Sequence, residues 1–300
     1  MSPPEGKPSK APHFRRVALI GKLGTPEIPA SLRELDAFLK SRGCETFIEK
    51  DSAAELGVRG TEYSAMGGTV DLAVVVGGDG TMLAAARNLV RAHVPVVGVN
   101  QGRVGFMTDI GHRDMQSGLG AILDGKYSLE ERALLDGEIV RGSQSALRTL
   151  ALNEAVVGKG SQGRLIEFEL RLDGEYIYTL RADGMIVATP TGSTAYALSA
   201  QGPILHPAVP ALALVPLNPH TLSARPVSIS DKTKIEIVLK HALDARAHFD
   251  GLALFDMQEG DRLILRRSAD AVRFVHPPGY QYFATLREKL RWSEGLVKEK

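Results

Sequence analysis

The feature that most constrains the fold is an apolar run that ends in glycines. Residues 71–83 read DLAVVVGGDGTML, so three valines are followed by Gly77, Gly78 and Gly80 and then by helix-forming residues. A strand that is apolar on both faces must be covered on both faces, as in a parallel sheet. Glycines after such a strand let the chain turn tightly and let a ligand approach the backbone. The stretch predicts a strand, a turn and a helix, with a ligand site at the strand's carboxyl end.

Strand and helix patterns alternate through the first part of the chain. After Pro29, an apolar residue recurs at helical spacing at Leu32, Leu35, Phe38 and Leu39. Further strands are expected over residues 15–21, 44–50 and 94–100, and a second helix over residues 82–92. Alternating strands and helices connect through right-handed crossovers. This part therefore predicts an α/β N-terminal domain with a parallel, Rossmann-like, doubly wound sheet.

From about Ala133 the pattern changes to alternation with period two. Ile166, Phe168, Leu170 and Leu172 alternate with charged residues, and an Asp-Gly turn follows. The same alternation recurs in KIEIVLK and DRLILRR, which predicts a β-rich C-terminal domain, an all-β sandwich. We expect a disordered tail over residues 1–15, the α/β domain over 16–132, the β-rich domain over 133–275, and a C-terminal segment over 276–300 that packs back on the α/β domain.

Composition and charge narrow the class of protein. The 300 residues carry a formal net charge of +1, which gives no basic surface for a nucleic acid. No stretch approaches the roughly 20 apolar residues of a membrane helix, and the polar N-terminus is unlike a signal peptide. The single cysteine, Cys44, excludes an internal disulfide and is expected to be buried in a strand. We predict a cytoplasmic protein without nucleic-acid or membrane partners.

Asp79 stands among the glycines of GGDGT, where an acid repels phosphate unless it has another task. Two tasks fit: accepting a proton from an attacking hydroxyl, or holding a metal. The alternative is that Asp79 is only a turn residue, and the pentapeptide alone leaves these alternatives open. Thr81 is expected to cap the following helix. The stretch matches neither the G-x-x-x-x-G-K-[ST] phosphate loop nor G-x-G-x-x-G.

Two further stretches carry polar groups beside apolar strands. Residues 189–196, TPTGSTAY, follow a strand and offer hydroxyl groups as a cradle for a hydroxyl-rich or phosphorylated ligand, or else form a Ser/Thr-rich turn. Asn153 and Glu154 interrupt the apolar LALNEAVVG, and either point to solvent or bind a sugar. Arg103, in NQGRVGF, is either a phosphate contact or a plain loop arginine. His220 is expected to be structural.

Together these stretches resemble the NAD kinase family. GGDGT, NQGRVGF, LNE, RADGMIVATPTGSTAYALSAQGPIL and PHTLSARP stand in the family's order between about residues 16 and 273. GGDGT alone also resembles lipid kinases and some phosphofructokinases, whereas TPTGSTAY at this distance from it is specific. The resemblance implies an α/β domain plus a β-rich domain with the site between them, in a homo-oligomer (dimer or tetramer).

The resemblance also implies an activity and a set of contacts. The reaction is transfer of the γ-phosphate of ATP to the 2′-hydroxyl of the adenosine ribose of NAD, giving NADP, with Asp79 as general base and a divalent cation, Mg²⁺, on the phosphates. The implied NAD contacts are Asp79, Gly80, Asn153, Glu154, Arg164, Arg181, Asp183, Thr194, Ala195, Tyr196, Ala197, Leu198 and Ser199. The implied ATP phosphate contacts are Gly77, Gly78, Thr81 and Arg103, with no dedicated metal site in the protein.

The chain departs from the family pattern at two positions. Leu252 stands where a glutamine is common, and Gln201 stands where glycine is usual. Both departures bear on affinity and substrate preference, since neither touches the proposed catalytic group.

Three other functions compete with this prediction. A lipid kinase fits GGDGT but not TPTGSTAY with Asn153 and Glu154. A non-catalytic NAD(P)-binding regulator would not need Asp79. A dehydrogenase would need the missing G-x-G-x-x-G. The sequence leaves open whether polyphosphate replaces ATP, whether NADH is accepted and whether NADP(H) inhibits.

Overall fold

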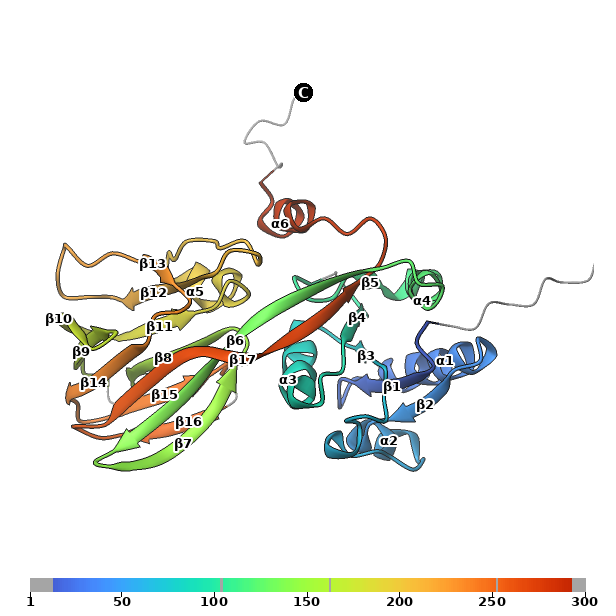
Figure 1. Ribbon diagram of the computed structural model, residues 1–300, viewed down its shortest axis with the longest axis horizontal. Helices are drawn as coiled ribbons and strands as arrows, with labels where there is room; N and C mark the ends of the chain where they lie inside the picture. Colours follow the sequence, from blue (N-terminus) through green and yellow to red (C-terminus); the bar gives the residue numbers. More distant parts are fainter. Residues whose placement is uncertain (1–12, 103–104, 162, 252, 293–300) are drawn as a thin grey trace, which may run out of the picture. The chain divides into compact units, whose positions relative to one another are not determined.

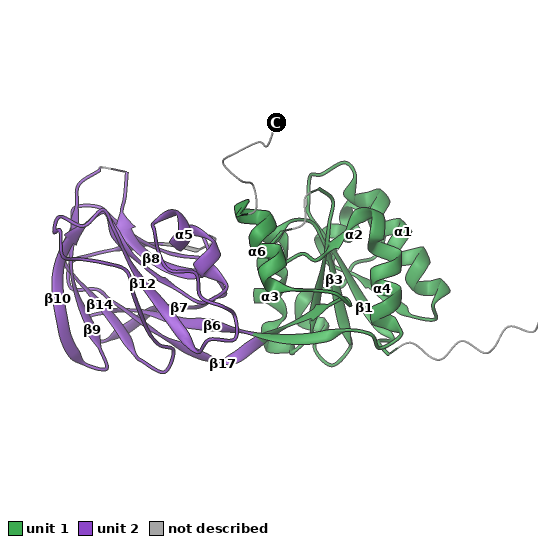
Figure 2. Ribbon diagram, turned by 90° about the horizontal axis from the view of Figure 1, so that it is seen from above, with its two compact units in different colours: residues 1–131, 272–300 green, residues 132–271 purple. Residues whose placement is uncertain are grey.

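The structure is a computed structural model that describes residues 13–102, 105–161, 163–251 and 253–292 (Figure 1). The chain forms two compact units, one of residues 1–131 and 272–300 and the other of residues 132–271 (Figure 2). The chain passes between the units twice, inside the long strands β6 (Ser128–Arg141) and β17 (Arg262–His276). In the described part of the chain, no helix is both long and apolar enough to cross a membrane.

The first unit is a parallel α/β structure. Its strands are β1 (Arg16–Gly21), β2 (Glu45–Ile48), β3 (Leu72–Val76), β4 (Val96–Asn100), β5 (Ile110–Gly111) and the end of β17. Its α-helices are α1 (Ile28–Ser41), α2 (Lys50–Leu56), α3 (Asp79–Leu89), α4 (Met115–Leu123) and α6 (Tyr282–Leu290), with short 3-10 turns at Tyr63–Ala65, Val90–Ala92 and His112–Asp114. The strand order is β2-β1-β3-β4, followed by the end of β17, and all these pairs are parallel.

Burial explains why these segments form a covered parallel sheet. All five residues of β3 are buried, which confirms the prediction from its apolar run. In α1 the residues Ile28, Leu32, Leu35 and Leu39 are buried on one face and pack into the same core as β1, β3 and β4. The parallel Rossmann-like sheet expected from the sequence is therefore confirmed.

His276, at the end of β17, is buried between two carboxylates of the same unit. Its Nδ1 lies 2.5 Å from Oδ2 of Asp109, and its Nε2 lies 2.9 Å from Oε2 of Glu130. The ring of Tyr280 stacks on the imidazole at 3.8 Å between centroids. Burial alone would lower the pKa of His276, but the hydrogen bonds with Asp109 and Glu130 raise it above its ordinary value. The His276 side chain thus ties together the segment before β5, the start of β6 and the end of β17.

This buried ion pair predicts a stability that falls as pH rises. Because the pKa of His276 is higher in the folded chain than in the unfolded chain, its contribution is complete below about pH 6.5 and is lost as pH rises through the folded-state pKa. We expect the Tm, measured from about pH 6 to 9, to decline less in His276→Gln than in the wild type. The control is His241→Gln at an exposed histidine. Equal pH slopes in wild type and His276→Gln would contradict the prediction.

The second unit is an antiparallel β-sandwich. One sheet contains β10 (Glu175–Ala182), β9 (Ile166–Leu172), β14 (Ile235–His241) and β17 in that order, with β6 and β7 (Gln144–Ala151) attached. The other has the order β13 (Val227–Ser230), β12 (Ala211–Leu217), β11 (Gly184–Ala188), β8 (Glu154–Lys159), β15 (Ala245–Phe249) and β16 (Ala253–Met257). A 3-10 turn (Gly192–Thr194) and the short helix α5 (Tyr196–Ser199) follow β11.

One face of each sheet enters a shared core. Phe168, Leu170 and Ile237 contribute from the first sheet, and Val157 and Phe249 from the second. This core confirms both the sandwich and the period-two alternation read from residues 166–172.

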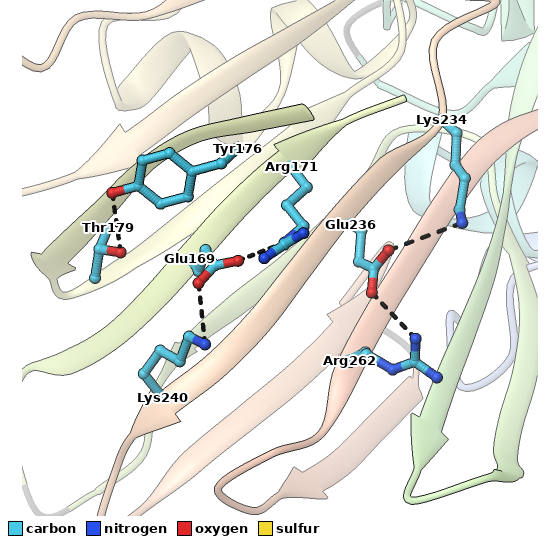
Figure 3. Close-up of polar contacts among 8 residues, drawn as sticks. All are labelled: Glu169, Arg171, Tyr176, Thr179, Lys234, Glu236, Lys240 and Arg262. Carbon is cyan, nitrogen blue, oxygen red and sulfur yellow. Dashed lines mark hydrogen bonds and ion pairs between the residues drawn. The ribbon is translucent and has the colours of Figure 1, made fainter. Parts of the chain in front are cut away.

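The first sheet of the sandwich carries ion pairs on its other face (Figure 3). Glu169 of β9 lies between Arg171 of the same strand and Lys240 of β14, whose Nζ is 3.0 Å away. Glu236 of β14 lies between Lys234 and Arg262, whose Nη1 is 3.2 Å away. Each acid thus bridges to at least one neighbouring strand, and the charged positions of the alternation are paired across the sheet.

Three local expectations need comment. Thr81 does not cap α3: the helix begins at Asp79, its N-cap is Gly78, and Thr81 lies in the first turn. Cys44 is buried as expected, but it precedes β2 by one residue. Phe14, at the end of the expected tail, is buried in the core of the first unit, while residues 1–12 lie outside the described residues.

Candidate active site

Asp79 is fixed in place by the loop that follows β4. Its Oδ2 accepts the backbone N–H of Phe106 at 2.9 Å, and its Oδ1 accepts the N–H of Met107 at 3.0 Å. A carboxylate has about four acceptor positions, so each oxygen keeps capacity for a ligand. Asp79 therefore does more than shape its own turn: it is held half-buried at the N-terminus of α3 by a distant segment.

The glycines around Asp79 have two different functions. A Cβ on Gly77 would overlap with the side chain of Thr81, so this glycine lets the strand pack against the helix. A Cβ on Gly78 or Gly80 would meet nothing within 4 Å, so the backbone there faces open space. Backbone N–H groups at a helix N-terminus that face open space form a favourable site for phosphate. Arg103, the predicted phosphate contact, lies outside the described residues.

The loop after β4 is shaped to receive the Asp79 carboxylate. Thr108 Oγ1 accepts hydrogen bonds from the Asn100 side chain and the Gly105 N–H, at 3.0 and 2.9 Å. A Cβ on Gly105 would overlap directly with the carboxylate of Asp79. Gly105 thus leaves free the space that the carboxylate of Asp79 occupies.

This close approach predicts that Gly105→Ala displaces Asp79. We expect turnover to fall by on the order of tenfold to a hundredfold, because Asp79 is the predicted catalytic group and small displacements of such a group are costly. The matched control is Gly111→Ala in β5, where the nearest atom to a new Cβ is 3.7 Å away. Steady-state kinetics on both variants measures the effect, and equal activity of the two would refute it.

In the second unit, alternation along β8 builds a pocket. Ala155 and Val157 point into the sandwich core, so Glu154, Val156 and Gly158 lie on the opposite face of the sheet. They form part of a cavity of about 360 Å³. The lining residues are Glu154, Val156, Gly158, Lys159, Asp183, Tyr196, Leu217, Asn218, His248 and Gly251.

Asn153 and Glu154 each have a buried oxygen without a hydrogen-bond partner among the described residues. These atoms are Oδ1 of Asn153 and Oε2 of Glu154. Burial, and then the nearby charge of Asp250, raise the pKa of Glu154 to about 7. Buried polar atoms normally have partners, so two neighbouring exceptions indicate a place for ligand hydroxyl or amino groups. The alternative that this pair points into solvent is wrong for Glu154, which is 7% exposed.

Asp183 forms a charged edge of the same pocket. Its Oδ1 lies 2.6 Å from Nζ of Lys159, and its Oδ2 accepts a hydrogen bond from Asn218 at 2.8 Å. Burial alone would raise the pKa of Asp183, but the hydrogen bonds from Lys159 and Asn218 hold it below its usual value. Asp183 is therefore an anion and an acceptor at neutral pH, and it lies beside Lys159, at the other end of β8 from Glu154.

The hydroxyl groups of TPTGSTAY hold the turn itself. Thr189 and Ser193 are fully buried; Thr189 Oγ1 donates to Leu152 O at 2.5 Å, and Ser193 Oγ donates to Pro190 O at 2.6 Å. Thr194 Oγ1 donates to Thr191 O at 3.2 Å. These three hydroxyl groups thus donate to the backbone, as the alternative of a Ser/Thr-rich turn expects, and the stretch contributes the Tyr196 side chain to the pocket. The ligand contact predicted for Thr194 stays a prediction.

The other predicted contacts occupy varied positions. Ala197 is the buried residue of α5, Ala195 and Leu198 are half-buried, and Ser199 lines a second depression of about 770 Å³ with Gln201 and Asn218. Arg164 and Arg181 are exposed, and Arg181 lines a third depression with His220 and Arg225. The ligand contacts predicted for these residues stay predictions.

The two departures from the family pattern have different outcomes. Gln201 has φ of +61°, the left-handed region that favours glycine, so the usual glycine there has a conformational reason. Leu252 lies outside the described residues.

Several site residues escaped the sequence reasoning. His248, Lys159 and Asn218 line the pocket, and Asp250 contacts the residues beside it. Two of them had a signal in period-two spacing, since His248 and Asp250 alternate with the core residues Ala247 and Phe249. Strand pairing, which single-strand patterns do not reveal, brings them to Glu154.

Because Oε2 of Glu154 is buried without a partner among the described residues, we expect the substitution Glu154→Gln to stabilise the folded chain. The folded-state pKa of Glu154, about 7, exceeds the ordinary 4.5, so its contribution is complete below about pH 4.5 and is lost as pH rises through 7. Glu154→Gln cannot ionise, so we expect it to unfold less readily than wild type at pH 8, by on the order of 2–3 kcal/mol, and equally at pH 4.5. Urea unfolding at both pH values measures this, with exposed Glu175→Gln as control. A less stable Glu154→Gln at pH 8 would contradict the assignment.

The carboxylate at the open glycine turn of the α/β unit suits phosphoryl transfer, and the sandwich carries a polar pocket. Residues 17–127 match the ATP-NAD kinase N-terminal domain, and residues 152–277 match the ATP-NAD kinase C-terminal domain. An NAD kinase of Aromatoleum aromaticum is 54% identical over 95% of this chain and 97% of its own length. One of Azoarcus sp. is 53% identical over 94% and 97%. The chain belongs to the NAD kinase family.

Solved structures agree with this assignment. An NAD kinase from Archaeoglobus fulgidus in complex with ATP superimposes with a TM-score of 0.74 at 28% identity, covering 92% of this chain and 98% of that one. Yeast NADH kinase complexed with NADH has a TM-score of 0.89 at 24% identity, covering 96% and 91%, which shows a common fold. The chain is an enzyme with NAD kinase activity, a phosphotransferase with an alcohol group as acceptor, so the lipid kinase, regulator and dehydrogenase alternatives fall away.

Proposed function

We propose that the chain transfers the γ-phosphate of ATP to the 2′-hydroxyl of the adenosine ribose of NAD, with Asp79 as general base. The observation that carries the proposal is the Asp79 carboxylate, held by two backbone N–H groups beside the open backbone of Gly78 and Gly80. Phosphoryl transfer needs positioning and charge neutralisation more than covalent catalysis. An acid fixed next to a phosphate site supplies the positioning and accepts the proton.

The donor and the acceptor have separate sources of support. The N-terminus of α3, with its open glycines, suits the phosphates of ATP, and the Archaeoglobus relative is described with ATP bound. For NAD, the unpartnered oxygens of Asn153 and Glu154 suit ribose hydroxyls, and Asp183 suits the amide of the nicotinamide end. In this assignment Asp79 takes the proton of the 2′-hydroxyl while Asn153 and Glu154 orient the ribose.

A divalent cation fits this donor set when it arrives with ATP. No group of three or more His, Cys, Asp or Glu among the described residues is arranged to hold a metal. Mg²⁺ commonly takes one or two carboxylates and completes its shell with water and substrate phosphates. Asp79, with acceptor capacity left on each oxygen, is the residue that would contact it. When bound, the cation neutralises charge on the transferred phosphate. The homo-oligomeric state and the cytoplasmic location stay predictions from the sequence.

The test is formation of NADP from NAD, ATP and Mg²⁺, coupled to an NADP-specific dehydrogenase. We expect Asp79→Asn to lower kcat by about a hundredfold or more, because the amide cannot accept the proton. Binding of NAD, measured by calorimetry on the same variant, should persist.

Asp114→Asn is the matched control, since Asp114 is an exposed acid before α4 whose side chain caps nothing. A near-normal kcat in Asp79→Asn would overturn the assignment of the base. Failure of the wild type to form NADP would overturn the reaction itself.

A further inference from the structure

Asp250 lies directly after β15, and it binds three successive backbone N–H groups of another segment. Its Oδ2 accepts the N–H of Leu152 at 2.8 Å, and its Oδ1 accepts those of Asn153 and Glu154 at 2.7 and 3.0 Å. Asp250 is 8% exposed and has φ of 55°, in the left-handed region that only a minority of non-glycine residues adopt. The left-handed backbone conformation of Asp250 thus places its carboxylate against the start of β8.

The carbonyl groups of the same three residues are occupied as well. Leu152 O accepts from Thr189 Oγ1 at 2.5 Å, and Asn153 O accepts from Thr189 N–H at 2.9 Å. Glu154 O accepts from the N–H of Asp250 itself at 2.9 Å. The backbone from Leu152 to Glu154 is therefore bonded on both sides, by Asp250 and by Thr189.

This arrangement leaves side-chain atoms as the free polar groups of the segment. Oδ1 of Asn153 and Oε2 of Glu154 are buried and have no partner among the described residues. A backbone that is fully bonded cannot rotate to satisfy these oxygens internally, so they are kept for a ligand. The chemistry matters too: only a carboxylate presents acceptors to three N–H groups without a competing donor.

We propose that Asp250 is a positioning residue for the kinase reaction, holding Asn153 and Glu154 in register for the ribose of NAD. The inference rests on the proposed contact of these two residues with NAD. Asp250 touches no substrate in this assignment; it acts through the backbone of the segment and through its negative charge beside Glu154. Of the described residues, the charged or titratable groups that line the pocket with Glu154 are Lys159, Asp183, Tyr196 and His248.

The test is the isosteric change Asp250→Asn. Its amide group must face at least one backbone N–H, so we expect kcat/KM for NAD to fall by roughly tenfold to a hundredfold. Loss of the negative charge lowers the pKa of Glu154. The limb of the pH profile of kcat/KM that follows the ionisation of Glu154 should therefore move to lower pH. A merely structural function would lower activity at every pH without moving this limb.

The control is Asp256→Asn on the adjoining strand β16, an exposed acid paired with Arg246, which should leave kcat/KM and its pH profile unchanged. A double-variant cycle with Glu154→Gln is decisive. If Asp250 acts through Asn153 and Glu154, the kcat/KM of the double variant should be only slightly lower than that of the less active single variant. The proposal would be overturned if the fold-losses of kcat/KM in the two single variants multiplied in the double variant. A wild-type pH profile in Asp250→Asn would overturn it as well.

Two further comparisons keep the test conclusive. Should Asp250→Asn fail to fold, Asp250→Glu retains the charge but lengthens the side chain. It should lower kcat/KM with little movement of the pH limb, and wild-type kcat/KM in it would overturn the proposal. Glu154→Gln alone tests the underlying contact: wild-type kcat/KM in that variant would remove the proposed function of Glu154, independently of Asp250.

Discussion

The sandwich depends on one constraint, which is that β8 must bury one of its faces. Ala155 and Val157 enter the core shared with Phe249, and burial of such side chains contributes about 1.5–3 kcal/mol for a valine or phenylalanine. Because side chains alternate along a strand, this burial turns Glu154 and Val156 to the other face, where the pocket lies. The hydrophobic core thus fixes the register of the site, and a slip of one residue would exchange core and pocket.

The pocket lowers the stability of the folded chain at one of its side chains. Glu154 is buried, it lacks a partner on one oxygen, and its pKa is raised to about 7. An unsatisfied buried carboxyl is costly to the folded state. The cost is confined to side chains, since Asp250 and Thr189 satisfy the backbone of the same segment. Asp183 represents the opposite case, because Lys159 and Asn218 satisfy both of its oxygens.

In the α/β unit a different constraint places the candidate site. The strand β3 is covered on both faces, so functional groups cannot lie along it and appear only where it ends. Asp79 begins α3 there, and the backbone of the loop after β4 fixes its carboxylate. Gly105 permits that contact because it has no side chain to occupy the space of the carboxylate. Orientation of the acid therefore depends on a segment more than 20 residues away.

The sequence by itself determined the class of each unit and the segments proposed to carry the chemistry. Apolar runs, helical spacing and period-two alternation are local, so they predicted the parallel sheet, the sandwich and the positions of Asp79, Asn153 and Glu154. It misjudged Thr81, and it left open whether the hydroxyls of TPTGSTAY meet a ligand or their own turn, because the polar group that a hydroxyl meets is set by packing. Only the tertiary structure decided that Asp250 binds the start of β8 and that His248 enters the pocket. Strand pairing over almost a hundred residues leaves no local pattern, since the partners are chosen by the shape and burial of the whole sheet.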